Sequence, residues 1–107
     1  MAKKPGEAVR GSATGRPLMV LLDALGRRWA LRILWELSGG PASFRDLQAR
    51  CGDISPTVLN ARLKDLRDLA LIALTGEGYA LTTYGQDLVG RFGALDAWAN
   101  DWAKSLS

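Results

Sequence analysis

Histidine is absent from the 107 residues, and cysteine occurs once, at Cys51. Because histidine is the commonest metal ligand and the usual general base near neutral pH, its absence argues against a metal site and against acid–base catalysis. The carboxylates are scattered singly, so local spacing assembles no acid–base or nucleophile–base pair. A lone cysteine forms no intramolecular disulfide and fits a reducing cytoplasm. We therefore expect a protein that is not an enzyme and that holds no metal and no cofactor.

Long apolar runs are also missing. Lys3 and Lys4 precede a short apolar run at residues 18–22, which is too short for a signal peptide or a membrane span and is followed directly by Asp23. A chain of this length, with 48% hydrophobic residues, suffices for one domain with a small core. The sequence predicts a soluble, cytoplasmic protein that does not bind membranes.

Charge is only slightly unbalanced, with 14 Lys and Arg against 11 Asp and Glu, a net of +3 and a pI near 9.4. The first 50 residues hold nine of the basic and four of the acidic residues. This distribution permits nucleic-acid binding without requiring it. Residues 1–16 contain three glycines and no apolar periodicity. They predict a mobile basic tail, which either tracks phosphates or is an inert terminus.

Residues 54–66 are the most informative stretch, because they predict a sharply bounded amphipathic helix. Ser55 is a favourable N-cap, and Pro56 suits the first helical position. The apolar face comprises Leu59, Leu63, Leu66 and Ala70. The opposite face is small, polar and basic, and comprises Thr57, Asn60, Ala61 and Lys64. Such a face fits the major groove, where an amide can pair with adenine and cations with phosphates. The alternative is a polar face that only contacts water.

Helices are also predicted before this stretch. Pro17 opens one over residues 17–25, with leucines at helical spacing, and Gly26 ends it. A second follows Arg27 and Arg28, two cations that the helix dipole does not favour at a helix start. Their use is therefore external, either on phosphates or in solvent. Ser43 opens a short helix over residues 44–50, and a glycine-containing turn joins it to the next helix, as a helix-turn-helix requires.

A β-hairpin is predicted from residues 71–75 and 79–82, which flank a glycine-rich turn. A hairpin directly behind a helix-turn-helix is a wing. This one contains no Lys or Arg and carries Glu77 at its tip, where phosphates would repel it. We expect the wing to serve mainly as part of the core.

Residues 84–106 predict one long helix with an apolar stripe at spacings of three and four. A helix of this length would measure roughly 35 Å, longer than so small a body can cover. Its far end should pack elsewhere, and aromatic residues are enriched at interfaces. We infer a homodimer through this helix. The dimerisation residues are Leu88, Phe92, Leu95, Trp98 and Trp102. The alternative is that Trp98 and Trp102 pack back on the first helix.

Several segments together carry a family resemblance: residues 25–29 with 33–37, residues 44–47, the Ser-Pro-x-Val-Leu-x-x-Arg-Leu run from Ser55, residues 79–82 with Gly85, and the closing Trp98 and Trp102. Over about residues 17–102 the chain resembles the HxlR-type winged helix-turn-helix transcriptional regulators. The resemblance implies a bacterial regulator that binds a two-fold operator as a dimer, with one recognition helix per half-site. It implies DNA contacts at Ser55, Thr57, Asn60, Arg62 and Lys64, and a phosphate contact at Arg45. Many members sense electrophiles through a cysteine just before the proline of the first helix; Arg16 stands there in this chain, which excludes that route.

The sequence therefore predicts a mainly α (α+β) fold, a winged helix-turn-helix with a short two-stranded wing and a long C-terminal dimerisation helix. The predicted parts are a flexible basic tail at residues 1–16, a DNA-binding domain at 17–83 and a dimerisation helix at 84–107. The predicted function is a homodimeric repressor on double-stranded DNA, with Arg27, Arg28 and Arg45 on phosphates. The alternative is a winged-helix module for protein interaction or small-molecule sensing with weak DNA binding. A pocket between the first and last helices is the candidate effector site.

Overall fold

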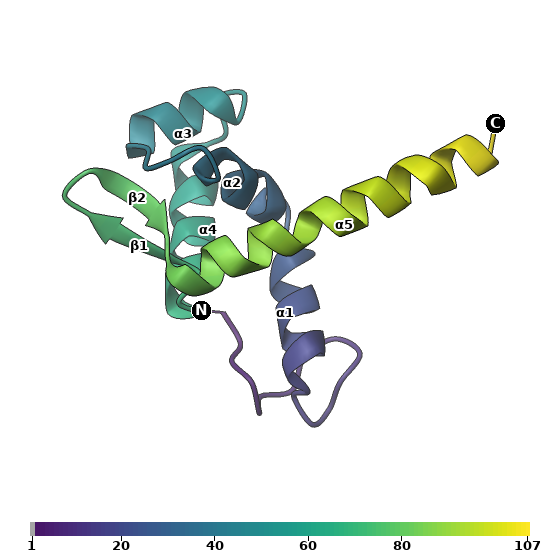
Figure 1. The fold of residues 1–107 in the computed structure, drawn as a ribbon. Coiled ribbons are helices and arrows are strands. Elements are labelled where there is room, and N and C mark those ends of the chain that lie inside the picture. Colours follow the sequence, from purple (N-terminus) through teal and green to yellow (C-terminus); the bar gives the residue numbers. More distant parts are fainter. Residues whose placement is uncertain (1) are drawn as a thin grey trace.

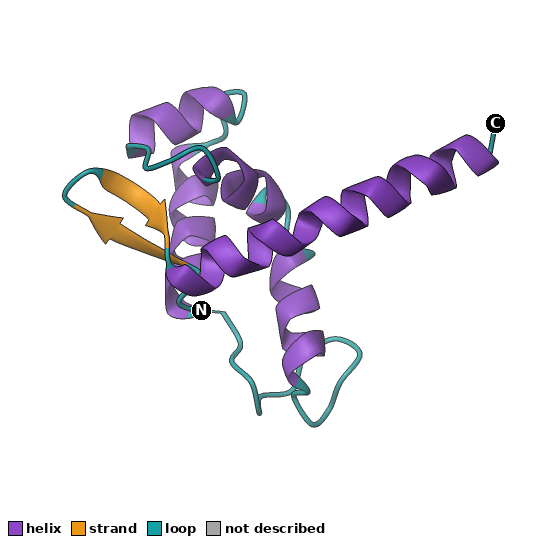
Figure 2. Cartoon of the chain, viewed as in Figure 1, coloured by secondary structure: helices purple, strands orange, loops and turns teal. Residues whose placement is uncertain are grey.

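The computed structural model describes residues 2–107 and arranges them as five helices and one two-stranded sheet. The elements in chain order are α1 (Pro17–Leu25), α2 (Ala30–Leu37), α3 (Phe44–Arg50), α4 (Pro56–Asp68), β1 (Ile72–Thr75), β2 (Gly78–Leu81) and α5 (Thr83–Ser105). Figures 1 and 2 show α1 to α4 and the hairpin gathered beside the first half of α5, whose second half runs away to the C-terminus. The predicted order of elements and the mainly helical winged fold are confirmed.

The core is built around α2, which contacts α1, α3, α5 and β2. Ile33 and Leu34 of α2 are fully buried at 0% exposure, as are Leu47 of α3 and Leu59 of α4. Each fully buried side chain of this size contributes roughly 1.5–3 kcal/mol to folding. The leucine spacing of α4 therefore fixes which side of that helix faces inward.

The N-caps of three helices are formed by hydroxyl side chains. The Ser43 Oγ accepts a hydrogen bond from the Asp46 N–H at 3.0 Å, and the Ser55 Oγ accepts one from the Val58 N–H at 3.1 Å. The Thr82 Oγ1 accepts one from the Gly85 N–H at 3.1 Å. The predicted caps at Ser43 and Ser55 are confirmed. Each such cap is worth about 1 kcal/mol.

The C-terminal end of α4 differs from the prediction at Ala70. This residue was expected on the apolar face of the helix, but it is exposed and left-handed, with φ +58°. The helix ends at Asp68, and the Leu71 N–H then donates to the Leu66 carbonyl at 3.0 Å. This hydrogen bond turns the chain towards β1, so Ala70 leaves the apolar face that the 3.6-residue period predicts for it.

The predicted hairpin is confirmed, with β1 and β2 antiparallel and Thr75 paired with Gly78. No sequence pattern indicates that Ala42, before α3, also forms a backbone bridge with Tyr79. The Ala42 N–H donates to the Tyr79 carbonyl at 2.9 Å, and the Tyr79 N–H donates back at 2.8 Å. Gly78, at φ +110°, passes so close to Ala42 that a side chain would not fit. This bridge ties the wing to the start of α3.

Residues 2–16, for which the sequence predicts a mobile tail, make several backbone and side-chain contacts, and Met1 lies outside the described residues. Val9 and Ser12 form a short antiparallel bridge, and the Gly6 N–H donates to the Gly15 carbonyl at 2.9 Å. Ser12 is buried, and Arg10 pairs with Asp23 of α1. Polar anchoring and close glycine turns, rather than apolar periodicity, hold this segment. On α1 itself Val20 and Ala24 are buried, whereas Leu18 and Leu22 are 63% and 49% exposed.

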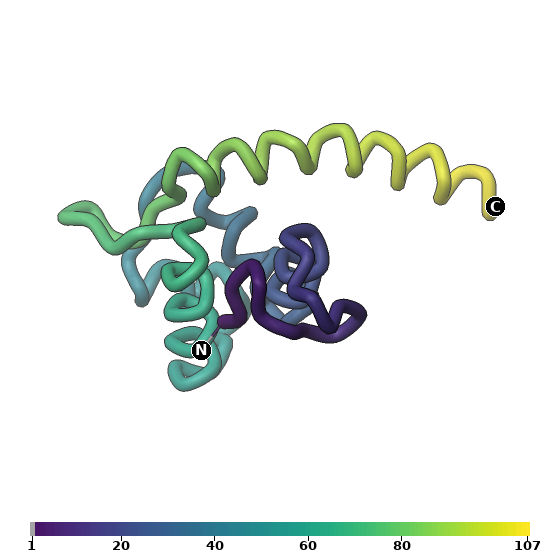
Figure 3. The backbone as a smooth tube through the Cα atoms, turned by 90° about the horizontal axis from the view of Figure 1, so that it is seen from below, coloured from purple at the N-terminus to yellow at the C-terminus, as the bar shows by residue number. Residues whose placement is uncertain are grey.

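The long helix α5 packs only through its first half. Gly85 is buried where α5 crosses the start of the hairpin, and a Cβ there would overlap the carbonyl oxygen of Leu71. Leu88 and Val89 pack against the core from half-buried positions. Figure 3, seen from below, shows the remaining turns of α5 extending past the other elements. The expectation that the far end leaves the body is confirmed.

Candidate nucleic-acid interface

The exposed side of α4 presents the polar residues predicted for it. Thr57, Asn60 and Lys64 are exposed, whereas Leu59, Leu63 and Leu66 on the opposite side are at most 1% exposed. Ser55 is exposed beside them; its oxygen accepts the cap hydrogen bond, and its hydroxyl proton remains available to donate to a ligand. The buried leucines hold α4 rigidly, and its polar side chains project outward.

Arg45 lies in the first turn of α3, on the exposed side of that helix. Within residues 2–107 its guanidinium forms no ion pair, in contrast to Arg10, Arg27, Arg32, Arg62 and Arg91. An unpaired, exposed guanidinium is well suited to bidentate contact with a phosphate.

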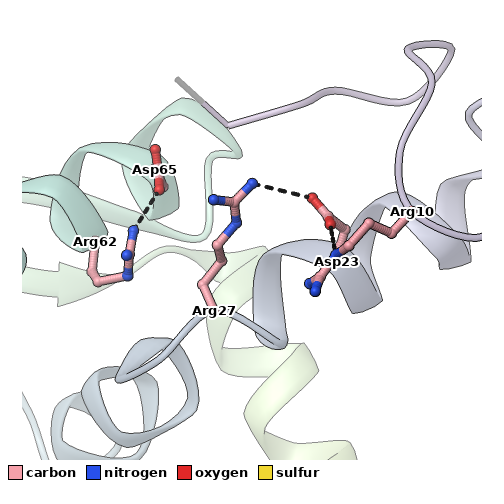
Figure 4. Close-up of polar contacts among 5 residues, drawn as sticks. All are labelled: Arg10, Asp23, Arg27, Arg62 and Asp65. Carbon is pink, nitrogen blue, oxygen red and sulfur yellow. Dashed lines mark hydrogen bonds and ion pairs between the residues drawn. The ribbon is translucent and has the colours of Figure 1, made fainter.

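Arg62 is engaged within the chain. Its Nε donates to the Arg28 carbonyl at 2.9 Å, and one terminal nitrogen donates to Asp65 Oδ2 at 3.1 Å (Figure 4). Its side chain is 20% exposed. Arg62 therefore joins α4 to the turn between α1 and α2.

That turn carries Arg27 and Arg28 beside α4. The Arg27 guanidinium lies 3.7 Å from Asp23 Oδ2, and the Arg28 guanidinium lies 5.3 Å from the centre of the Trp29 ring, within cation–π range. Trp29 has a left-handed backbone, with φ +78°, which is rare for a bulky residue and requires support from its surroundings. Trp29 precedes α2 rather than belonging to it, a one-residue difference from the prediction.

Two acidic residues, Asp23 and Glu77, add negative charge to this surface. The hydrogen bond from Arg10 holds the pKa of Asp23 below its ordinary value, against the opposing effect of burial. At the wing tip, Glu77 is exposed and the strands present no cation. The positive groups of the interface thus come from α3, α4 and the turn before α2, and not from the wing.

Cys51 lies between α3 and α4 and is 1% exposed. Burial raises the pKa of its thiol. Cys51 therefore packs as a small buried hydrophobe.

A second exposed surface is apolar. Along α5, Leu95, Trp98 and Trp102 are 62%, 60% and 52% exposed. The two indole rings stack, with centroids 5.8 Å apart and an interplanar angle of 9°. Because both rings are exposed, the alternative in which they pack back on α1 is excluded.

An open groove runs between this helix and the body, as expected of the first and last helices. It encloses about 670 Å³. Its lining is apolar apart from Asp96, and includes Leu22, Leu25, Leu31, Trp35, Phe92 and Leu95. Trp35 of α2, for which the sequence predicts no contact, is 60% exposed at this groove. Trp35 follows Leu31 by four positions, about one helical turn, and Leu31 is 48% exposed beside it at the same groove.

Two further features bear on function. Among the described residues, His, Cys, Asp and Glu form no group of three that could hold a metal ion. No helix within residues 2–107 combines the length and the apolar character that a membrane crossing requires.

Comparison with known proteins places these features in context. A model of the HxlR-like helix-turn-helix family matches residues 24–107. The chain is 31% identical over 88 residues to the uncharacterized HTH-type transcriptional regulator YvaP of Bacillus subtilis strain 168, a match that covers 76% of this chain and 82% of that protein. It is also similar to the crystal structure of quinone-bound YodB from B. subtilis, with a TM-score of 0.74 and 30% identity over 78% of this chain and 96% of that one.

Proposed function

The chain belongs to the HxlR-like helix-turn-helix family of transcriptional regulators, and from this premise we propose that it binds a two-fold DNA operator as a homodimer and acts as a repressor. The observation that carries the proposal is the division of α4 into a buried leucine side and an exposed side with Thr57, Asn60 and Lys64. A rigid helix with short polar side chains outward is what the major groove accepts.

Base reading is assigned to Thr57 and Asn60, because an amide can make two hydrogen bonds to adenine and a threonine can contact either a base edge or a thymine methyl. Lys64, Arg45, Arg27 and Arg28 bind phosphates and set the register of the protein on the duplex. Ser55 donates its hydroxyl proton to a phosphate at the start of α4. Arg62 keeps the turn with Arg27 and Arg28 beside α4 through its bond to the Arg28 carbonyl, and its remaining N–H groups are directed to the DNA backbone.

Dimerisation is assigned to the apolar side of α5 and the adjoining groove. Five residues form the interface on α5: Leu88, Phe92, Leu95, Trp98 and Trp102. The second half of α5 extends away from the rest of the chain (Figure 1) and carries the stacked, exposed Trp98 and Trp102. A second copy related by a two-fold axis can therefore cover them with its own groove. The two recognition helices would then address half-sites about one helical turn apart, roughly 34 Å.

Repression follows from occupancy, because a dimer seated on a promoter excludes other proteins from the same DNA. The regulator acts where bacterial DNA lies, in the cytoplasm. No enzymatic activity is part of the proposal, because the family that the chain matches regulates transcription.

A small-molecule effector is a second candidate function, favoured by the apolar groove of about 670 Å³ between α1, α2 and α5. YodB, to which the chain is similar, was crystallised with a quinone bound. Because Cys51 is buried, a ligand of this chain would bind without a covalent bond, through Leu31, Trp35 and Phe92. Such a ligand would compete with the second copy for the groove and so release DNA.

Fluorescence anisotropy tests the proposal directly. The duplex is taken from the region upstream of the chain's own gene, with a shuffled duplex as control, and both are titrated across a salt series. We expect a preference of at least about a hundredfold for the upstream duplex, which is modest for a specific binder. Equal, weak and salt-sensitive binding to both duplexes would contradict an operator-reading function and favour the protein-interaction alternative.

A further inference from the structure

Asp23 of α1 is a buried carboxylate held by two arginines, one on each oxygen. Its side chain is 7% exposed. The Arg10 Nε donates to Oδ1 at 2.8 Å, and the Arg27 guanidinium lies 3.7 Å from Oδ2. The first contact is a charge-assisted hydrogen bond, whereas the second is a looser ion pair without hydrogen-bond geometry. Asp23 therefore depends mainly on Arg10.

Arg10 is placed by a built turn. Val9 and Ser12 exchange backbone hydrogen bonds at 2.9 and 3.0 Å, which puts Arg10 and Gly11 at the tip of a small loop. Gly11 is left-handed, with φ +82°. The buried Ser12 Oγ accepts from the Arg16 N–H at 3.1 Å and so ties the loop to the start of α1. Only the Arg10 guanidinium crosses from this segment to Asp23 (Figure 4).

Arg27 lies near two groups of charged side chains, one on α1 and one on α4. Figure 4 shows its guanidinium reaching from the turn between α1 and α2 into the space between Asp23 and the Arg62–Asp65 pair of α4. The side chain is 50% exposed. The next residue, Arg28, accepts the bond from Arg62 that holds this turn to α4. Arg27 is thus close to the recognition helix while it is loosely held by Asp23.

We propose that Arg10 is a positioning residue for DNA binding: by satisfying Asp23 on its own, it leaves Arg27 free to pass from Asp23 to a DNA phosphate. The inference rests on the proposed phosphate contact of Arg27. Without Arg10, departure of Arg27 would strand a buried, unpaired carboxylate, and breaking such a pair is costly. Asp23 would then retain Arg27 and compete with the DNA for it.

The test is a double-mutant cycle on DNA affinity, with Arg10→Gln in the wild-type and Arg27→Gln backgrounds. Arg10→Gln should weaken binding to the upstream and shuffled duplexes alike, by about fivefold, the upper range for a partly exposed ion pair. In the Arg27→Gln background the same change should have no further effect. Arg16→Gln is the matched control, since Arg16 is an exposed cation of the same segment.

Asp23→Asn separates positioning from mere structural support. In the Asp23→Asn background, Arg10→Gln should leave DNA affinity unchanged, because no carboxylate remains to hold Arg27. This pair of variants keeps the test valid if Arg10→Gln alone fails to fold, since the buried charge has been removed. Circular dichroism melts of every variant report the folded fraction independently of DNA.

The outcomes are distinguishable. If Arg10→Gln still lowered DNA affinity in the Arg27→Gln or Asp23→Asn background, Arg10 would contact DNA itself, and the inference would be overturned. A folded Arg10→Gln protein with wild-type DNA affinity would also overturn it. In both of these cases wild-type DNA binding is intact and the proposed function stands. Failure of the wild-type chain to bind either duplex would overturn the proposed function and the inference together.

Discussion

Helix α4 and the second half of α5 are both amphipathic, but the apolar residues of α4 are buried whereas those of α5 are exposed. The leucines of α4 are at most 1% exposed, whereas Leu95 and Trp98 of α5 are about 60% exposed. The buried side of α4 leaves a polar side for a charged ligand. On α5 the apolar side itself is unoccupied within the described chain. The apolar side of α4 is therefore covered within the single chain, whereas that of the second half of α5 is open to a partner.

The strongest test of this contrast is removal of the tryptophan pair. Trp98→Ala with Trp102→Ala should raise the dimer dissociation constant by about a hundredfold or more, because buried tryptophans dominate interface energies. Sedimentation equilibrium measures the constant. Asn100→Ala is the matched control, since Asn100 is exposed on the same helix but about half a turn from the stripe. A double variant that dimerises like the wild type would place the interface elsewhere.

Two glycines of α5 test where this helix stops packing against the other elements. Gly85→Ala should lower the free energy of unfolding by about 3 kcal/mol, because its Cβ would overlap the Leu71 carbonyl oxygen. A Cβ at Gly90 would meet no described side chain or neighbouring element within 4 Å. Gly90→Ala should raise the same free energy by roughly 0.5–1 kcal/mol through helix propensity. Urea denaturation in the monomeric double-tryptophan background separates folding from association, and equal effects at the two positions would contradict the packing boundary on α5.

Two variants, one on α4 and one on α3, should separate base contacts from phosphate contacts. Asn60→Ala should cut the preference for the upstream over the shuffled duplex by about tenfold and leave shuffled-DNA affinity unchanged, because base contacts specify. Arg45→Ala is the contrasting variant and should weaken both duplexes alike, with a salt slope smaller by about one. Anisotropy titrations measure both. If Asn60→Ala lowered both affinities equally, Asn60 would not read a base.

The smallest expected effect concerns α1, which lies between the two regions. Arg10 lowers the pKa of Asp23, so the ionised carboxylate stabilises the fold fully above the unfolded-state pKa of about 4, and this contribution is lost as the pH falls through the lowered pKa. The difference in unfolding free energy between the wild type and Asp23→Asn should therefore shrink between about pH 5 and pH 3. Urea denaturation across this range measures it. A constant difference would show that the pair does not couple to folding.

The parts of the fold that could be predicted are those with local causes. Ser43 and Ser55 cap the helices that follow them within three residues, and the leucines of α4 repeat at helical spacing, so both could be read from the sequence. The outer side of α4 follows from the same spacing. The apolar stripe of α5 was predictable from its helical spacing. Its exposure was predictable because the helix is longer than so small a body can cover.

The remainder depends on contacts between distant residues. Arg62 finds its acceptor on Arg28, 34 positions away, so a residue that the family resemblance assigns to DNA is also a structural tie. The Arg10–Asp23 pair spans 13 positions and gives residues 2–16 an anchor that no apolar pattern announces. The bridge of Ala42 to Tyr79 likewise joins a loop to a strand that follows much later in the chain. Such pairings require the assembled core before they exist.

The number of chains bound to one operator duplex tests most directly whether the chain binds its operator as a homodimer. Sedimentation equilibrium with a fluorescent upstream duplex at saturating protein gives this number. We expect two chains per duplex for the wild type and a marked loss of affinity for the Trp98→Ala, Trp102→Ala variant. One chain per duplex, with equal affinity for the wild type and that variant, would contradict this expectation.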